Sequence, residues 1–442
     1  MLFRSIRFGL DLLATHRLPA TDSYSFTSTQ PWINHEWLSQ LLFAGAYQWG
    51  GLTLLTLFRA VCVGCLLAAV NASARSLEWP ARDALLIGVL LTSLGQLSAV
   101  RPQALTLTIY AVLLLGLRRD AIWLPALFAL WANLHAGWLF GVGAVGVRAL
   151  CKPTKRRLLL TIGCLLATLV NPYGWRLWLA MADAMGRGWA DLEEWAPVTH
   201  PALGLGAIAM WIFIAGAGAW AGLRGRVRDP YAWIWTGLTA AAAFRSRRLM
   251  ALFAITTAML LIAPIRIRGR SLPHFVWSSG LMAIAAVPLS ASLIVSYSLI
   301  APTLKCLPAV SASLSPEASA VAFVRGHNLR GKVLMWFDYG LYAIWNVGDR
   351  LKVSIDNRRE TVYSREVVAE HQAFYRGLDP AYPSRIGADY VWLDATLLPV
   401  SQLQKSGWNV IFRGARSVIL SRAYLPLTTD NSAAPPACFP NP

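Results

Sequence analysis

Long apolar runs separated by short polar turns fill the first 300 residues of the chain. Several runs approach or exceed the roughly 20 apolar residues that an α-helix needs to cross the hydrocarbon core of a bilayer. The pattern predicts a polytopic α-helical membrane protein with about ten crossings. The predicted crossings are 52–73, 84–99, 104–117, 121–134, 136–150, 158–170, 202–222, 231–243, 250–265 and 275–301.

Two stretches leave the number of crossings open, because 84–117 and 121–150 each fit either one long helix or two short ones. With ten crossings, five basic loops fall on one side, and by the positive-inside rule that side is cytoplasmic. Fusing one pair would scatter these cations over both faces, so the charges favour the split. The loops contain Arg75/Arg82, Arg118/Arg119, Lys152/Lys155/Arg156/Arg157, Arg224/Arg226/Arg228 and Arg266/Arg268/Arg270.

After about residue 303 the pattern changes to short alternating runs and turn residues. Ser315-Pro-Glu317 has the composition of a helix start, and helical stretches are expected near 364–376 and 399–406. Strands are predicted at 332–337, 341–345, 351–355, 389–393, 409–412 and 417–420. The pattern therefore predicts a membrane domain over 1–302 with an outer loop at 1–51, a small extracytoplasmic α/β domain over 303–424, and a disordered tail over 425–442.

Composition agrees with a membrane protein, because 56% of the residues are hydrophobic and only 14% are charged. The net charge of +18 lies mainly in the membrane region, where residues 1–302 hold a surplus of 14 cations. Nucleic-acid binding is therefore not expected, since it needs a basic face on a soluble domain. The expected location is a membrane, with the C-terminal domain outside the cytoplasm.

The direction of the first crossing raises a separate expectation. No segment before residue 36 is apolar enough to cross, so the run at 52–73 must pass from outside to inside. A polar N-terminus would then already lie outside, without a signal peptide to carry it there. We expect a further helix upstream of Met1, and insertion with the N-terminus outside is the alternative.

The predicted sidedness gathers most of the unusual polar residues on the outer face. The stretch Pro31-Trp-Ile-Asn-His-Glu-Trp37 offers Glu36 as a general base for a hydroxyl nucleophile, with His35 assisting. A divalent cation held by Glu36, His35 and Asp22 is the second possibility. The structural alternative is a helix start at the interface, which explains Glu36 but not His35.

Arginines on the outer half contradict the orientation rule and therefore point to function. Arg59, Arg101, Arg245, Arg247 and Arg248 form this set. An arginine fork matches the oxygens of a phosphate, so these residues are candidates for a lipid phosphate or pyrophosphate. Snorkelling towards headgroups is the alternative. Further candidates for the cavity and the substrate are Gln103, Asn133, His135, Asp191 and Glu194.

Two other polar stretches lie in the C-terminal domain, where Asp338, Asp356 and Arg358 stand at predicted strand ends. Strand ends of α/β sheets bind ligands, but a structural salt bridge is the simpler explanation here. The sequence contains no P-loop, zinc signature, G-x-S-x-G or G-x-G-x-x-G of any weight.

Eight motifs occur in order along nearly the whole chain: RLPATDSYSFTSTQPWINHEWLSQ, SAVRPQ, LWANLHAGWLFG, NPYG, EEWAP, FRSRRL, DYGLYAIW and SIDNRRETVY. In these motifs the chain resembles a group of bacterial polytopic proteins assigned to the GT-C-like membrane glycosyltransferases, which are similar to protein O-mannosyltransferases and aminoarabinose transferases. The resemblance implies a bacterial inner membrane as the location.

The resemblance implies transfer of a sugar from a polyprenyl-phosphate donor to an acceptor on the extracytoplasmic side. Such enzymes place a catalytic acid in the first outer loop, where this chain offers Asp22 and Glu36. The group also has an acid at the end of its first helix, and this chain begins at or after that point. This difference puts its activity in question, and the alternative is a non-catalytic protein for binding, transport or assembly of lipid-linked glycans.

Overall fold

The computed structural model describes residues 2–28, 30–78, 80–97, 100–186, 195–265, 307–308, 316–358, 361–430 and 438–439. These residues divide into two compact units. The helical unit contains His35–Ser39 and Leu55–Leu293. The mixed unit contains Met1–Asn34, Gln40–Leu54 and Ile294–Pro442. This division differs from the predicted one, which kept all of residues 1–51 with the membrane domain.

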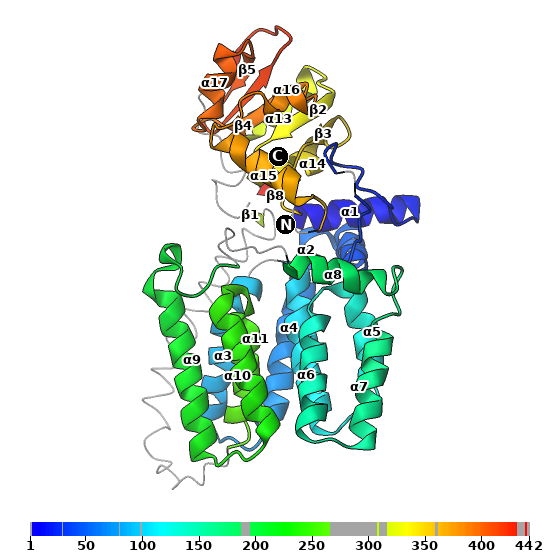
Figure 1. Cartoon of the computed structure of the whole chain (residues 1–442), viewed down its shortest axis with the longest axis vertical. Coiled ribbons are helices and arrows are strands. Elements are labelled where there is room, and N and C mark those ends of the chain that lie inside the picture. The colour runs from blue at the N-terminus through cyan, green and yellow to red at the C-terminus, as the bar shows by residue number, and fades with distance from the viewer. Residues whose placement is uncertain are drawn as a thin grey trace. The chain divides into compact units, whose positions relative to one another are not determined.

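The helical unit is built from long, mostly apolar helices (Figure 1). Its elements are the two ends of α2 (Trp37–Ser73), whose residues Gln40–Leu54 belong to the mixed unit, and α3 (Ala81–Leu97), α4 (Pro102–Arg118), α5 (Leu124–Leu134), α6 (Trp138–Cys151), α7 (Lys155–Ala167), α8 (Arg176–Gly186), α9 (Gly204–Arg224), α10 (Pro230–Arg245) and α11 (Met250–Thr257). A π-helical turn, Ala258–Ile262, follows α11. Most helices run up and down, whereas α8 lies across one end of them.

Among the described residues, two helices, α2 and α9, are long and apolar enough to cross a membrane, and α4, α5 and α6 are shorter apolar helices. Helices lie at the other predicted positions within the described residues, but α2 begins at Trp37, well before the predicted 52–73, and α8 was not predicted. The predicted crossing 275–301 lies outside the described residues. Helix α2 is not straight, because Gly50 and Gly51 leave helical geometry and Gly51 has a φ of +59°. The part after this kink corresponds to the predicted crossing at 52–73.

The two ambiguous stretches each form two helices. Helices α3 and α4 separate at Arg101, which has extended backbone and precedes Pro102 at the first turn of α4. Helices α5 and α6 separate at His135, which is also extended. A proline at the first helical position is compatible with a helix start but not with a continuous ladder of hydrogen bonds. The α6–α7 and α9–α10 loops consequently lie at the same end of the unit, as Figure 1 shows.

The mixed unit contains a six-stranded sheet with the order β3-β2-β4-β6-β5-β7. Strands β3 and β4 flank β2 in parallel, β6 runs antiparallel to β4 and β5, and β7 is parallel to β5. The strands are β2 (Gly331–Met335), β3 (Leu351–Val353), β4 (Tyr390–Asp394), β5 (Asn409–Arg413), β6 (Ser417–Ser421) and β7 (Thr428–Thr429); β1 (Leu307–Pro308) pairs with β8 (Cys438–Phe439). Strands β2 to β6 confirm the strands predicted at 332–337, 351–355, 389–393, 409–412 and 417–420. Strands β1, β7 and β8 were not predicted, and β7 and β8 lie in the segment predicted to be disordered.

The helices of the mixed unit are α1 (Leu2–Thr15), α13 (Ala318–Gly326), α14 (Gly340–Val347), α15 (Arg365–Tyr375), α16 (Tyr382–Arg385) and α17 (Pro399–Lys405). The predicted strand at 341–345 is wrong, because α14 occupies it. Nearly every residue of α14 is buried, and a short run that is apolar on all sides has no periodicity to separate helix from strand. Helix α1 was not predicted, and it packs against α14.

Candidate functional site

The helical unit brings Glu36 together with two histidines. His35 and Glu36 form the turn before α2, and His135 lies in the break between α5 and α6. The Nε2 atoms of His35 and His135 each lie 3.8 Å from Oε1 of Glu36. The three side chains are largely buried, and the two imidazole rings are 6.5 Å apart. A carboxylate between two imidazoles is a group that can accept a proton and pass it on.

A second layer fixes the orientation of His135. Its Nδ1 lies 2.8 Å from the hydroxyl of Thr106 on α4, and this hydroxyl also accepts a hydrogen bond of 3.0 Å from Nε1 of Trp131. Gly137 passes so close to Thr106 that a Cβ there would collide with the threonine side chain. These contacts hold one ring nitrogen of His135 and leave Nε2 directed at Glu36.

Asn133 has a structural part in the same region. Its Oδ1 accepts a hydrogen bond of 2.9 Å from Nε1 of Trp37, and its Nδ2 donates to the carbonyls of Ala129 and Val170. These bonds connect the start of α2 to α5 and to the segment that follows α7. Asn133 therefore positions the segment that contains Glu36, although the sequence suggested it as a substrate contact.

A cavity of about 460 Å³ gathers most of the predicted phosphate ligands. Arg101 and Gln103 enter it from the start of α4, and Arg247 and Arg248 enter it from the segment that follows α10. The Arg248 guanidinium lies 4.8 Å from the ring centre of Trp195, a cation–π distance. The Oε1 atom of Gln103 is buried and has no hydrogen bond within the described chain.

This arginine cavity has the chemistry of an anion site. Among the described residues, its lining is Leu91, Thr92, Gly95, Gln96, Arg101, Gln103, Met210, Arg247, Arg248, Met250 and Ala251. That set contains three guanidinium groups and no carboxylate. Gln96 donates to the carbonyl of Arg248 and so fixes the backbone beside the cavity. Three guanidinium groups around one space favour a phosphate or pyrophosphate.

The cavity does not contain the whole predicted set. Arg59, Arg245, Glu36 and His135 are not among its described lining residues. Thr106, which contacts His135, follows Gln103 by about one turn of α4, so the two groups occupy neighbouring turns of this helix. Two further candidates, Asp191 and Glu194, lie outside the described residues.

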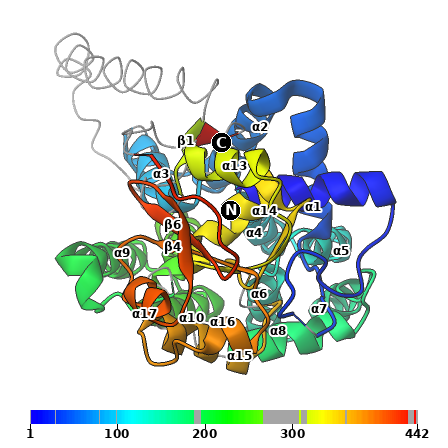
Figure 2. The ribbon, with the colours of Figure 1, turned by 90° about the horizontal axis from the view of Figure 1, so that it is seen from above.

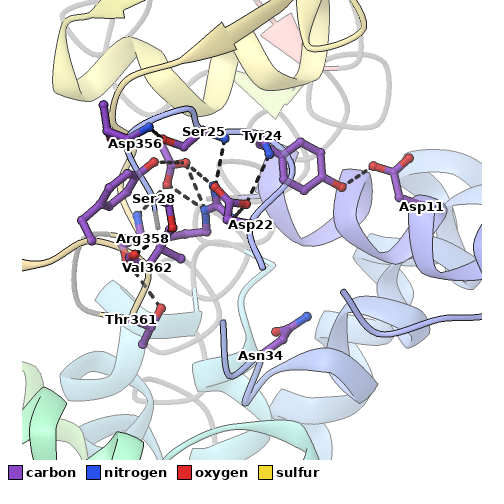
Figure 3. Close-up of polar contacts among 12 residues, drawn as sticks. Asp11, Asp22, Tyr24, Ser25, Ser28, Asn34, Asp356, Arg358, Thr361 and Val362 are labelled. Carbon is purple, nitrogen blue, oxygen red and sulfur yellow. Dashed lines mark hydrogen bonds and ion pairs between the residues drawn. The ribbon is translucent and has the colours of Figure 1, made fainter. Parts of the chain in front are cut away.

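Asp22 belongs to a separate ion cluster in the mixed unit, which Figure 3 shows. Both nitrogens at the tip of Arg358 bind the carboxylate of Asp22, at 2.7 and 3.0 Å. The same guanidinium binds Asp356, which also accepts a hydrogen bond of 3.0 Å from the hydroxyl of Tyr363. The three charged side chains are at most 2% exposed. Buried charges persist when they are paired and hydrogen-bonded, as here.

Aromatic rings enclose this cluster. The centre of the Arg358 guanidinium lies 4.6 Å from the ring of Phe8, 5.1 Å from that of Trp32 and 5.5 Å from that of Tyr24. Burial opposes ionisation of Asp356, but the charge and hydrogen bonds of Arg358 together lower the pKa of that carboxyl. Burial also acts against the Arg358 cation, and the two carboxylates nonetheless raise its pKa. Asp356 and Arg358 therefore stay ionised as a pair.

These contacts correct the predicted role of Asp22. Both of its oxygens bind Arg358, so they support a structural ion cluster rather than a catalytic base or a metal ligand. The salt bridge proposed between Asp356 and Arg358 is confirmed. Among the residues that the structure describes, no group of three or more His, Cys, Asp or Glu side chains is arranged to hold a metal ion.

The N-terminal segment owes this position to main-chain pairing. The amide of Phe26 donates to the carbonyl of Val353, and the amide of Val353 donates to the carbonyl of Tyr24, both at 3.1 Å. Residues 24–26 thus extend the sheet beside β3. The hydroxyl of Ser28 adds a hydrogen bond of 3.0 Å to the carbonyl of Val362. Nothing in the local sequence of 20–30 indicates a partner more than 320 residues away.

Comparison with known proteins gives no family assignment. No protein-family model matches the chain, and no curated protein matches it. The proposal below therefore depends on the geometry of the helical unit and on the resemblance of the sequence motifs.

Proposed function

We propose that the protein is a multi-pass membrane glycosyltransferase of GT-C type, with about ten crossings and an extracytoplasmic α/β domain in a bacterial inner membrane. It transfers a sugar from a polyprenyl-phosphate donor to an acceptor hydroxyl. One observation supports this most: Glu36, His35 and His135 converge, and the arginine cavity opens beside the neighbouring turn of α4. Two apolar helices of crossing length support the membrane location.

The chemistry divides between the two groups. Glu36 removes the proton from the acceptor hydroxyl, with His35 and His135 stabilising the carboxyl in either protonation state. The acceptor oxygen then attacks the anomeric carbon, and the bond from this carbon to the donor phosphate oxygen breaks. The leaving polyprenyl phosphate gains negative charge, which Arg101, Arg247 and Arg248 neutralise. Apolar lining such as Leu91 and Met210 suits the first carbons of the lipid chain.

A non-catalytic protein that binds or moves lipid-linked glycans is the second candidate. The observation that favours it is the lining of the arginine cavity, which among described residues lacks Glu36 and both histidines. Such a protein would bind the donor without consuming it. The transfer assay separates the two candidates.

The test is transfer of a radiolabelled sugar from a polyprenyl-phosphate donor in membranes that contain the full chain. We expect labelled product with the wild-type chain and none with Arg247→Gln/Arg248→Gln. Donor binding to this double variant should weaken about tenfold or more, because two charge-assisted contacts are lost. Arg245→Gln is the matched control, since Arg245 is exposed in the same segment but does not line the cavity.

The outcomes are distinct. Donor binding that depends on Arg247 and Arg248 without any transfer supports the carrier. Transfer that survives the double variant but not loss of Glu36 would remove the arginine cavity from the mechanism. No binding and no transfer by the wild-type chain would overturn both candidates.

A further inference from the structure

A second basic cavity lies at the other end of α4. It has a volume of about 370 Å³ and is formed by the ends of α4 and α6, the α9–α10 loop and the π-helical turn after α11. Helix α4 has 17 residues, so its ends are about 25 Å apart. The arginine cavity is at the start of α4 and this one is at its end, so the two are separate sites.

Four arginines and one aspartate are among the described residues of its lining. They are Arg118, Arg148, Arg226, Arg228 and Asp229. Asp229 is already engaged, because it accepts a hydrogen bond of 3.0 Å from the amide of Tyr231 and lies 3.1 Å from Nζ of Lys152. Its negative charge is therefore shared with a lysine, and the lining has a large surplus of positive charge.

Two arginines of the lining, Arg148 and Arg118, are preorganised by fixed contacts. Arg148 lies 3.1 Å from Asp120, which also binds Arg157 at 2.9 Å. Arg118 donates to the carbonyl of Ser73 at 3.1 Å and to the carbonyl of Met259, which the π-helical turn presents. Backbone carbonyls do not neutralise a guanidinium, so Arg118 keeps its charge at the cavity. Fixed guanidinium groups bind an anion with little loss of side-chain entropy.

Tyr231 helps to hold Arg148 in place beside the cavity. This lining residue is only 2% exposed. Its ring lies 5.5 Å from the guanidinium carbon of Arg148, a cation–π distance, so the two side chains fix one another.

We propose that this cavity binds a phosphate ester, with Arg118, Arg148, Arg226 and Arg228 supplying the positive charge. The volume suits a phosphate with a small attached alcohol. Two sources have this chemistry, an anionic phospholipid headgroup and a soluble phosphate. Basic pockets between helices at the cytoplasmic side of membrane proteins bind anionic headgroups. The site does not depend on sugar transfer.

The experiment measures binding to the purified full chain in neutral detergent at fixed salt. The probes are short-chain phosphatidylglycerol, short-chain phosphatidylcholine and inorganic phosphate, each followed by calorimetric titration. We expect phosphatidylglycerol to bind at least about tenfold more tightly than phosphatidylcholine. Arg226→Gln/Arg228→Gln should weaken the binding of phosphatidylglycerol about tenfold or more, because two cations that attract the anionic headgroup are removed.

Two further variants keep the test specific. Arg119→Gln/Arg224→Gln removes the same charge from exposed positions next to the cavity that are not part of its lining, and it should leave binding within about twofold. Tyr231→Phe keeps the ring against Arg148 and removes only the hydroxyl, which has no exposed surface in the cavity, so it should also leave binding within about twofold. Unchanged melting temperatures show that the variants fold.

Each outcome bears on the proposal. Preference for phosphatidylglycerol with loss in the cavity double variant supports a lipid headgroup. Saturable binding of inorganic phosphate with the same loss, and no preference between the lipids, supports a soluble phosphate at this site. If the cavity double variant and the control double variant lose the same amount of binding, the effect comes from general surface charge and the proposal is overturned. The proposal is also overturned if none of the probes binds.

Discussion

Asp22 and Glu36 come from one polar stretch of the sequence, yet the structure places them in two different buried clusters. Asp22 meets one guanidinium through two hydrogen bonds of 2.7 and 3.0 Å, whereas Glu36 meets two imidazoles at 3.8 Å. Arg358 stays ionised at every accessible pH, and imidazoles change charge near neutrality. A carboxylate fixed in a short bidentate pair stabilises a fold, while one next to titratable groups at longer distance can take up and release protons.

Figures 1 and 2 show the part of the mixed unit that contains the cluster of Asp22, Asp356 and Arg358. Helix α1 lies beside α14 in both views, and the segment after α1 reaches β3. Arg358 therefore joins two parts of one unit that are far apart along the chain. The comparison predicts that damage to the Asp22 cluster appears as lost stability, and damage to the Glu36 cluster as lost turnover.

The largest expected effect is on turnover. Glu36→Gln keeps the size of the side chain and removes the base, so transfer should fall about 10²- to 10⁴-fold. Asp22→Asn should leave transfer per folded molecule within about threefold, because Asp22 is engaged by Arg358. Initial rates of sugar transfer, normalised to folded protein, measure both. Similar losses in the two variants would erase the distinction between the clusters.

The largest effect on stability should come from Arg358→Met. It removes the only cation in contact with both Asp22 and Asp356 among the described residues and leaves two carboxylates buried. Loss of one partner of a buried ion pair costs about 3–5 kcal/mol. Thermal unfolding of the full chain, followed by near-UV circular dichroism, measures this change. Arg330→Met, at an exposed position of the same unit, is the control and should change stability by less than about 0.5 kcal/mol.

A pH-dependent effect is expected from His371 in the mixed unit. Burial lowers the pKa of this imidazole to about 4, although its hydrogen bond to the carbonyl of Val367 acts in the opposite direction. Ser354 lies 2.8 Å from its other nitrogen. In the unfolded chain a histidine has a pKa of about 6.5.

The sign follows from which state takes up the proton. Between pH 6.5 and pH 4 the unfolded state binds a proton that the folded state does not, so stability falls as the pH falls. The full change is about 3 kcal/mol over this range. Denaturant titrations at several pH values should show the slope, and His371→Gln should reduce it. An identical slope in this variant would exclude His371 as its source.

The smallest effect on transfer is expected from Thr106, the residue that contacts His135 on the side away from Glu36. Thr106→Val removes the hydroxyl that contacts Nδ1 of His135 and accepts from Trp131. Transfer should fall about tenfold, and the pH optimum should move, because the imidazole loses a fixed hydrogen-bond partner. Thr106→Ser keeps the hydroxyl and should restore both. A rate that falls without any movement of the pH profile would assign Thr106 to packing alone.

Much of the helical unit follows from its local sequence. Apolar runs of membrane length, the prolines at the first turns of α4 and α10, and the charges in the loops determined where helices begin, end and turn. The residues 341–345 show the limit, because a run buried on all sides gives no periodic signal. The side chain of Thr106 was also missed, since a threonine within an apolar helix is usually satisfied by the carbonyl four residues earlier.

By itself, the sequence determined the helical character, the breaks at Arg101 and His135, and most strands of the sheet, because these depend on residues that are near one another along the chain. It also singled out Glu36, His35, His135 and the arginines by their unusual chemistry. Only the tertiary structure decided which of them meet. Asp22 and Glu36 are 14 residues apart in one polar segment. Pairing of residues 24–26 with Val353 brings Asp22 to Arg358, which binds its carboxylate. Glu36 instead lies beside His135, in the break between α5 and α6.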